Sequence, residues 1–268
     1  MKSKIYDCVT FFDNNLMFEL RYNILKNVVD FFVICESKFD HQGNEKKINF
    51  INKKNYDSKK IKYYILETPF PKNNNAWQNQ ELQREFLLES LKNVNPDDYI
   101  FFSDPDEIPR PELLIDFSLK KKFGIFLQRC FNYKLNLFNP YESPWEGTRV
   151  AKKKYLKSID FMRQKIKSKN LNYSFLRFDK EKSVELFNEG GWHFNNVMNP
   201  KEISLKLKTF AHSEFSDPKF SDEQIIQDKI RRQLDLFDRG HKYFKIEIDK
   251  SFPQFIINNK IFYQKWIL

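Results

Sequence analysis

Residues 99–107 read YIFFSDPDE, an apolar run followed at once by two carboxylates one residue apart. An apolar run of this length, bounded by turn residues, indicates a buried strand. Residues i and i+2 of an extended or tightly turning backbone point the same way, so Asp104 and Asp106 can face one cation while Pro105 stiffens the turn. Hard oxygen ligands suit Mg²⁺ or Mn²⁺. Aspartates at this spacing alone are a weak signal, but their position after a strand predicts a divalent-metal site.

Strand-like and helix-like segments alternate on either side of this loop. Apolar strand runs cover residues 5–12, 30–36, 61–66 and 98–103, and helical patterns cover residues 15–27 and 77–91. Such alternation favours an α/β fold with a mostly parallel central sheet flanked by helices. Ligands of these sheets collect at the carboxyl ends of the strands, which is where the acidic loop lies.

The second half of the chain is less regular. We expect a strand over 125–137, a Lys-rich helix near 155–166, a glycine-entered strand over 189–194 and a helix over 200–210 with Pro200 in its first turn. Ser221 and Gln224 form a capping-box pattern that predicts a helix running to Arg239 and stopped by Gly240. Neither an internal repeat nor a linker divides the chain, so we expect a single domain over residues 1–268.

The chain is basic, with a formal net charge of +10 over 268 residues. This charge favours an anionic partner, which could be nucleic acid, an acidic membrane surface or a phosphorylated substrate. The lysines gather modestly, at 120–122 and 152–154, without the aromatic interleaving of a nucleic-acid platform. We therefore do not expect nucleic acid as the partner, and most of the lysines fit a solvated surface.

The apolar segments are too short to cross a bilayer, and the N-terminus leads into a strand pattern rather than a signal-peptide core. We expect a cytoplasmic protein, with peripheral contact to an anionic membrane surface as a further expectation. Cys8, Cys35 and Cys130 lie inside apolar runs, which indicates buried reduced thiols rather than a disulfide framework or a zinc cluster.

Five blocks of the sequence, in order, resemble glycosyltransferase family 17. They are YDCVTFF at 6–12 with ELR at 19–21, VDFFVICES at 29–37, SDPDEIP at 103–109, PWEGTR at 144–149, and GGWHF at 190–194 continuing to AHSE at 211–214. The resemblance implies a glycosyltransferase A-type (Rossmann-like) fold, a UDP-sugar donor that is usually UDP-N-acetylglucosamine, a glycan acceptor and inversion at the anomeric carbon. It also implies a nucleotide-sugar half over 1–123 and an acceptor half over 124–268.

The chain departs from the Golgi members of this family because no membrane anchor and stem precede the first block. We therefore expect the acceptor to be a bacterial or viral surface glycan rather than a glycoprotein.

The resemblance also carries expectations for the site. A cation bound by Asp106 would neutralise the leaving diphosphate. Asp104 would reach the ribose or a metal-bound water, and His212 could complete the metal shell. The base that activates the acceptor hydroxyl is left open among Glu214, Glu189 and His193, although His193 fits a buried core histidine about as well.

Donor and acceptor residues follow from the same placement. The donor would lie across the ends of the first strands, where the candidates are Thr10, Phe11, Glu19, Arg21 and Glu36, and Phe11 could equally be core. Arg84 could reach the diphosphate or pair with Glu81 on a helix surface. The indole faces of Trp145 and Trp192, with Arg149 nearby, suit a sugar acceptor, and either indole could instead be a core anchor.

Two other functions remain open from the sequence. A metal-dependent nucleotidyl or phosphoryl transferase also uses paired carboxylates, although the chain has no glycine-rich phosphate loop. A basic, non-enzymatic protein that binds nucleic acid or anionic lipid would make the acidic loop incidental.

Overall fold

The computed structural model describes residues 2–209 and 215–268, and these form an α/β fold around one mixed sheet. The main path of the sheet runs in the order β11-β7-β6-β8-β4-β1-β2-β3, with β9, β10 and β5 attached beside β6. The strands are β1 Ile5–Phe11, β2 Phe31–Ser37, β3 Ile61–Leu66, β4 Tyr99–Ser103, β5 Glu107–Pro109, β6 Phe123–Asn132, β7 Leu137–Phe138, β8 Trp145–Lys152, β9 Val184–Phe187, β10 Gly191–Asn195 and β11 Phe244–Lys245.

The four adjacent strands β3, β2, β1 and β4 are parallel, as the alternating pattern predicts. The α/β fold class is therefore confirmed. From β8 onward the sheet becomes mixed, because β8 pairs antiparallel with both β4 and β6.

The helices match the expected positions except near the C-terminal end. They are α1 Asn15–Leu25, α2 Ala76–Ser90, α3 Ile159–Lys165, α4 Pro200–Thr209, α5 Pro218–Ser221, α6 Glu223–Arg232 and α7 Gln254–Asn258, with short 3₁₀ turns at Pro111–Leu114, Lys153–Tyr155, Ser168–Asn172 and Gln264–Trp266. Within the described ranges, none of these helices has the length and apolar character that a bilayer crossing requires.

The prediction of one long helix from Ser221 to Arg239 is wrong. Asp222 rather than Ser221 caps α6, by accepting from the N–H groups of Gln224 and Ile225, and the helix ends at Arg232 because Gln233 adopts a left-handed conformation. An aspartate directly before a helix is as good a cap as a serine, so the sequence offered two start signals one residue apart.

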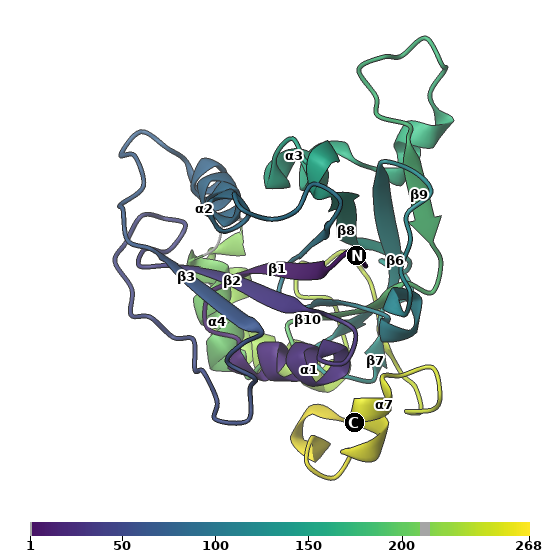
Figure 1. The fold of residues 1–268 in the computed structure, drawn as a ribbon. Coiled ribbons are helices and arrows are strands. Elements are labelled where there is room, and N and C mark those ends of the chain that lie inside the picture. The colour runs from purple at the N-terminus through teal and green to yellow at the C-terminus, as the bar shows by residue number, and fades with distance from the viewer. Residues whose placement is uncertain (1, 210–214) are drawn as a thin grey trace.

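Helices cover both faces of the parallel strands (Figure 1). Alternate residues along each strand point to opposite faces, so β1 sends Val9 toward α1 and Cys8 toward α2 and α3. Both faces of the strands are therefore buried, which explains their nearly continuous apolar sequences. Cys8, Cys35 and Cys130 are buried free thiols, as expected.

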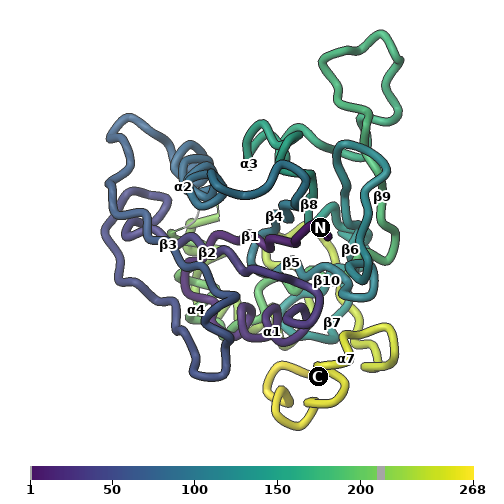
Figure 2. The backbone as a smooth tube through the Cα atoms, in the orientation of Figure 1, coloured from purple at the N-terminus to yellow at the C-terminus, as the bar shows by residue number. Residues whose placement is uncertain are grey.

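The register of the parallel strands brings their carboxyl ends to one edge. Phe11 of β1 lies beside Glu36 of β2, and Val9 lies beside Ser103 of β4. The acidic loop leaves β4 at this edge, and the chain returns through β5, beside β10, as the trace in Figure 2 shows. The fold thus gathers the loop, the end of β1 and strand β10 in one region.

Gly191 opens β10 and permits this return. Its φ is +134°, and a Cβ atom there would lie 2.1 Å from the carbonyl oxygen of Ile108 on β5. Only glycine allows the two backbones to approach so closely at this φ.

We predict that Gly191→Ala lowers the free energy of unfolding by about 3 kcal/mol, because strain at positive φ adds to the clash with Ile108. Gly43 also has a positive φ, +90°, but nothing lies within 4 Å of its added Cβ, so Gly43→Ala should cost only about 1 kcal/mol. Urea unfolding of both variants measures the difference. Equal losses would show that the β5–β10 approach is not a steric constraint.

Candidate functional site

The acidic loop is a tight turn rather than an extended segment. The Glu107 N–H donates to the Asp104 carbonyl at 3.0 Å, and the Asp104 N–H donates to the Glu107 carboxylate at 3.1 Å. These two bonds close the turn around Pro105 and place Glu107 at the start of β5. The geometry of the loop is therefore set by Glu107.

The Glu107 carboxylate is fully buried and bound by side chains from two other elements. Arg163 of α3 donates to both of its oxygens, at 2.6 and 3.2 Å, and Trp145 of β8 donates its indole N–H at 2.7 Å. A charged carboxylate is tolerated in the interior only when it is paired and hydrogen-bonded. Glu107 therefore supports the loop.

A second buried arginine supports the loop from the opposite side. Arg21 of α1 pairs with Asp7 at 2.6 Å and donates to the Ser103 hydroxyl and to the Glu107 carbonyl. Its side chain is wholly enclosed, so the sequence ELR at 19–21 encodes a structural ion pair.

Asp104 is clamped by two arginines. Its carboxylate accepts from Arg163 at 2.6 Å and from Arg84 of α2 at 3.5 Å, and Arg84 also donates to Asp160 at 3.1 Å. Burial works against ionisation, but Arg163 and Arg84 outweigh it and lower the pKa of Asp104. Arg84 is thus buried at the loop and is not the surface arginine paired with Glu81 that the sequence also allowed.

Asp106 faces a different pair of cations. Its carboxylate lies 3.5 Å from His193 of β10 and 3.6 Å from Lys206 of α4. Strand register delivers the histidine, because His193 pairs with Glu107 on β5 and with Cys130 on β6. Burial opposes ionisation here as well, yet His193 and Lys206 lower the pKa of Asp106 below its usual range.

The imidazole of His193 is held between Asp106 and Cys130, with the Trp145 ring 4.7 Å away. Burial alone would lower its pKa, but Cys130 and Asp106 raise the pKa of His193 well above the ordinary value. Burial also raises the pKa of the Cys130 thiol, which keeps that group neutral. The charged partner of His193 is therefore Asp106.

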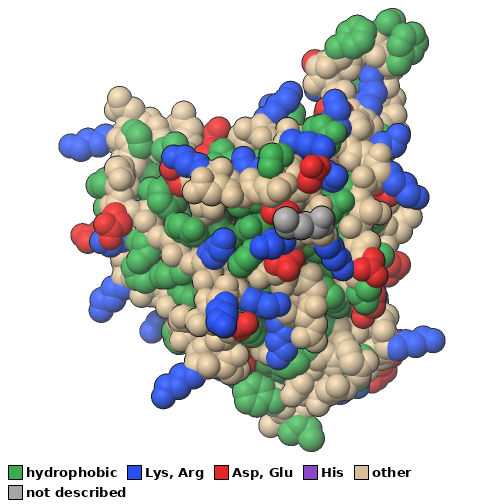
Figure 3. Space-filling model, in the orientation of Figure 1, with side chains coloured by type: hydrophobic (Ala, Val, Ile, Leu, Met, Phe, Trp, Pro, Cys, Tyr) green, Lys and Arg blue, Asp and Glu red, His purple; other side chains and the backbone are tan. Residues whose placement is uncertain are grey.

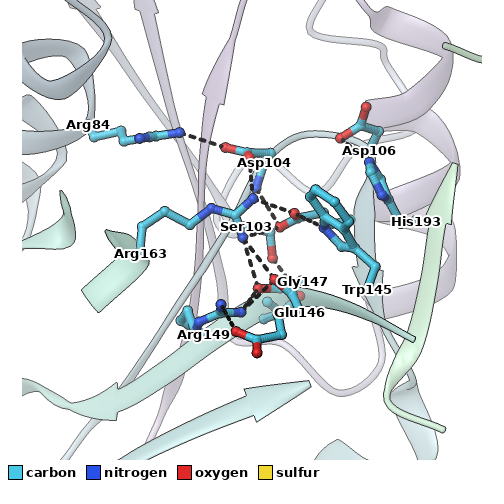
Figure 4. Close-up of polar contacts among 12 residues, drawn as sticks. Arg84, Ser103, Asp104, Asp106, Trp145, Glu146, Gly147, Arg149, Arg163 and His193 are labelled. Carbon is cyan, nitrogen blue, oxygen red and sulfur yellow. Dashed lines mark hydrogen bonds and ion pairs between the residues drawn. The ribbon is translucent and has the colours of Figure 1, made fainter. Parts of the chain in front are cut away.

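The two aspartates do not share a partner, contrary to the expectation for a D-x-D spacing. Figure 4 shows Asp104 turned toward Arg84 and Arg163, and Asp106 turned toward His193. This turn directs the two carboxylates apart, so the prediction that residues i and i+2 of a tightly turning backbone point the same way is wrong here.

The carboxylates fit a divalent cation in chemical type. Mg²⁺ and Mn²⁺ are commonly held by one or two ionised carboxylates together with substrate phosphates. Asp106 suits this role better than Asp104, because its ion pairs are longer and Asp104 is held at 2.6 Å by Arg163. Across residues 2–209 and 215–268, no cluster of three or more ligand side chains accompanies it.

A cavity of about 320 Å³ opens beside the loop, between α2 and α3. Arg84 and Asp160 form one wall, and the half-exposed Trp77 and the amides of Gln80 and Gln164 complete it. The Nε atom of Arg84 and the side-chain oxygen of Gln80 are buried there without a hydrogen-bond partner in the described chain. Buried polar atoms of this kind are normally satisfied, so these two unpaired atoms are exceptions within the described chain.

The candidate bases separate clearly. Glu189 is exposed in the turn before β10 and contacts Arg110, away from the acidic loop, so it does not contact the other site residues. His193 contacts Asp106, which raises its pKa, and its assignment as the base stays a prediction. Glu214 and His212 lie outside the described residues.

Most of the expected donor residues have structural roles. Phe11 packs in the core, Arg21 pairs with Asp7, and Glu36 is a buried acceptor for Lys46, Tyr63 and two backbone N–H groups. Glu19 pairs with Lys53. Thr10 is partly exposed at the end of β1 and remains a candidate.

The acceptor candidates divide in the same way. Trp192 is buried and donates to the Ser251 carbonyl, and Arg149 is buried and bound to backbone carbonyls of Glu146, Gly147 and Ile166. Neither has a face for a sugar, so both assignments are corrected to structural roles. Trp145 is partly exposed and lies at the site.

Sequence reasoning missed Arg163 and Lys206. Both belong to Lys- and Arg-rich helices that resemble ordinary solvated surface. The only signal in the sequence was a cation next to a buried helix position, Arg163 next to Met162 and Lys206 next to Leu207. This signal does not indicate which residue the cation contacts.

Comparisons with known proteins agree on one family. A family model described as glycosyltransferase family 17 matches residues 1–246. The human β-1,4-mannosyl-glycoprotein 4-β-N-acetylglucosaminyltransferase is 23% identical over 240 residues, which cover 79% of this chain and 44% of that protein. The rat enzyme of the same name is 22% identical over 242 residues, covering 79% and 43%. The chain thus spans less than half the length of these curated relatives.

Solved structures are more distant. Glucosyl-3-phosphoglycerate synthase of Mycobacterium tuberculosis gives a TM-score of 0.38 at 11% identity, covering 95% of this chain and 92% of that one. A glycosyltransferase involved in glycosylation of the major capsid of PBCV-1 gives 0.34 at 9% identity, covering 69% and 81%. Similarities at this level assign no activity.

We predict that Arg163→Ala lowers the free energy of unfolding by about 3 to 5 kcal/mol, because it leaves the buried Glu107 charge uncompensated. Arg163→Lys should recover only part of this loss, since an ammonium cannot bridge two carboxylates as a planar guanidinium does. Lys165→Ala, an exposed position on the same helix, is the control and should change stability by less than about 0.5 kcal/mol. Urea denaturation tests the series, and an Arg163→Ala variant as stable as the control would contradict it.

Proposed function

Because the chain belongs to glycosyltransferase family 17, we propose that it transfers a sugar from a UDP-sugar to a glycan hydroxyl with inversion at the anomeric carbon. The names of the curated relatives support N-acetylglucosamine as the transferred sugar. The observation that carries the proposal is the acidic loop itself, in which an ionised Asp106 is held at the carboxyl edge of the parallel strands.

We propose that Asp106 is the direct ligand of Mg²⁺ or Mn²⁺. A bound cation of this kind neutralises the charge of a leaving diphosphate. Lys206 and His193, which contact Asp106, add positive charge on the same side of the loop. Arg163 and Glu107 fix the turn, so the ligand is positioned before the donor arrives.

Arg84 is proposed to bind the donor. Its side chain lines the cavity beside Asp104, and its buried Nε–H lacks a partner in the described chain. Guanidinium groups bind phosphate oxygens with two parallel hydrogen bonds, which suits a diphosphate. Trp77 at the cavity rim offers an aromatic face to a base or a sugar ring.

The acceptor side rests on fewer contacts. Trp145 presents a partly exposed indole that is held by Glu107, and it is proposed to contact the acceptor sugar. Glu214 as base and His212 as metal ligand stay predictions from the family resemblance.

The two alternative functions lose support. Neither a nucleotidyl transferase nor a non-enzymatic basic protein explains why the chain belongs to a glycosyltransferase family. The cytoplasmic location and the peripheral contact with an anionic membrane surface remain proposals, and the net charge of +10 supports only the second.

We predict that Asp106→Asn abolishes Mn²⁺-dependent turnover of UDP-N-acetylglucosamine, with a loss of at least about 100-fold, because the amide removes the anionic ligand. Release of UDP, with and without candidate glycans, measures the effect. Asp228→Asn, at an exposed position on α6, is the matched control and should retain full turnover. Full activity of Asp106→Asn would exclude the proposed site.

Arg84→Ala should raise the Kd for UDP by about tenfold or more, because a charge-assisted hydrogen bond to phosphate is lost. Arg84→Lys should recover part of this affinity, and Lys92→Ala, at an exposed position just after α2, should leave the Kd unchanged. Calorimetric titration with UDP and Mn²⁺ compares the variants. An unchanged Kd in Arg84→Ala would place the diphosphate elsewhere.

A further inference from the structure

A loop over residues 173–183, between the 3₁₀ turn Ser168–Asn172 and β9, projects from the body of the protein (Figure 1). Its tip carries three large apolar side chains with high exposed fractions: Phe175 at 79%, Leu176 at 63% and Phe178 at 88%. In Figure 3 these form an apolar cap at the end of the projection. Apolar groups gathered at the end of an extended loop mark an interaction surface more strongly than scattered ones do.

The shape of the loop is fixed by its polar residues. Arg177 pairs with Asp179 at 2.7 Å and lies over the Tyr173 ring, and Lys180 contacts the same ring. Backbone hydrogen bonds from Arg177 to Ser174 and from Lys180 to Arg177 tighten the turn. These contacts use the basic and acidic side chains near the tip and leave the two phenylalanines directed outward.

The base of the loop is cationic. Lys120, Lys121 and Lys122 are exposed beside it, and their segment is joined to it because the Lys122 N–H donates to the Ser183 hydroxyl. Of the nearby carboxylates, Asp179 pairs with Arg177 and Lys180, whereas Glu181 and Glu185 accept backbone N–H groups and keep their charge. Lys120, Lys121 and Lys122 outnumber Glu181 and Glu185, so the base keeps a net positive charge. An apolar tip above such a base is complementary to a bilayer that has anionic headgroups over an apolar interior.

We propose that this loop is a membrane anchor that inserts Phe175, Leu176 and Phe178 into an anionic bilayer, while Lys120–Lys122 contact the headgroups. The proposal does not depend on the glycosyltransferase activity. The loop leaves the segment that also carries Arg163 on α3, so membrane contact would hold the site at a defined orientation to the surface.

Co-sedimentation of the full chain with vesicles tests the proposal without any sugar donor. The chain should bind vesicles that contain phosphatidylserine and should bind pure phosphatidylcholine vesicles at least about tenfold more weakly. The double variant Phe175→Ser with Phe178→Ser should lose about tenfold or more in binding to the anionic vesicles. Its unfolding midpoint should not change, because both side chains are exposed.

A second apolar tip supplies the control. Ile261 and Phe262 near the C-terminus are 85% and 74% exposed and lie between Lys260 and Lys265. The double variant Ile261→Ser with Phe262→Ser should bind anionic vesicles like the unmodified chain. Replacing Lys120, Lys121 and Lys122 with Gln should weaken binding and reduce its dependence on salt.

Three outcomes would overturn the proposal. They are failure of the unmodified chain to bind anionic vesicles, normal binding by the Phe175/Phe178 variant, and loss of binding only in the Ile261/Phe262 variant. The last outcome would move the anchor to the C-terminal tip. If the loop binds a protein partner and the unmodified chain does not bind anionic vesicles, the proposal is likewise overturned.

Discussion

The buried carboxylate of Glu107 fixes the acidic loop, and the geometry of the site depends on it. Arg163, the Trp145 indole and the Asp104 N–H all bind this one group. A buried charge is tolerated only when every partner is present, so α3, β8 and the loop have one mutual arrangement. Arg21 adds α1 to this set through the Glu107 carbonyl. Four segments distant in sequence are thereby fixed around one residue, Glu107.

This constraint gives the two aspartates different roles. Asp104 is drawn inward by Arg163 and Arg84, and it completes the ion-pair network. Asp106 is held by longer contacts to His193 and Lys206, which is why it is the proposed metal ligand. A rigid turn with one committed and one more loosely held carboxylate is a preorganised ligand position, because the network and not the donor sets its geometry.

Positive charge is likewise divided by burial. Four arginines are buried, and their planar guanidinium groups each bind several acceptors inside the protein: Arg21, Arg84, Arg149 and Arg163. The lysines at 120–122 stay exposed and leave the surface basic. Composition reports both kinds of cation as one net charge. Which of them neutralise carboxylates within the protein and which remain free for a partner depends on the packing of α2 and α3 against the sheet.

The sequence by itself determined the parallel core, the strand that ends at Ser103, the acidic loop and the family, because these depend on local periodicity and on contiguous motifs. It left Arg84 open between the diphosphate and a surface pair with Glu81, and the fold placed it at the loop. Only the tertiary structure decided that Arg149 and Trp192 are structural, that His193 contacts Asp106, and that Arg163 and Lys206 belong to the site. Each of these depends on contacts between distant segments, and such contacts leave no periodic signal along the chain. Burial and charge pairing are properties of neighbours in space, so the motif identified the position of the chemistry and the fold assigned the role of each side chain.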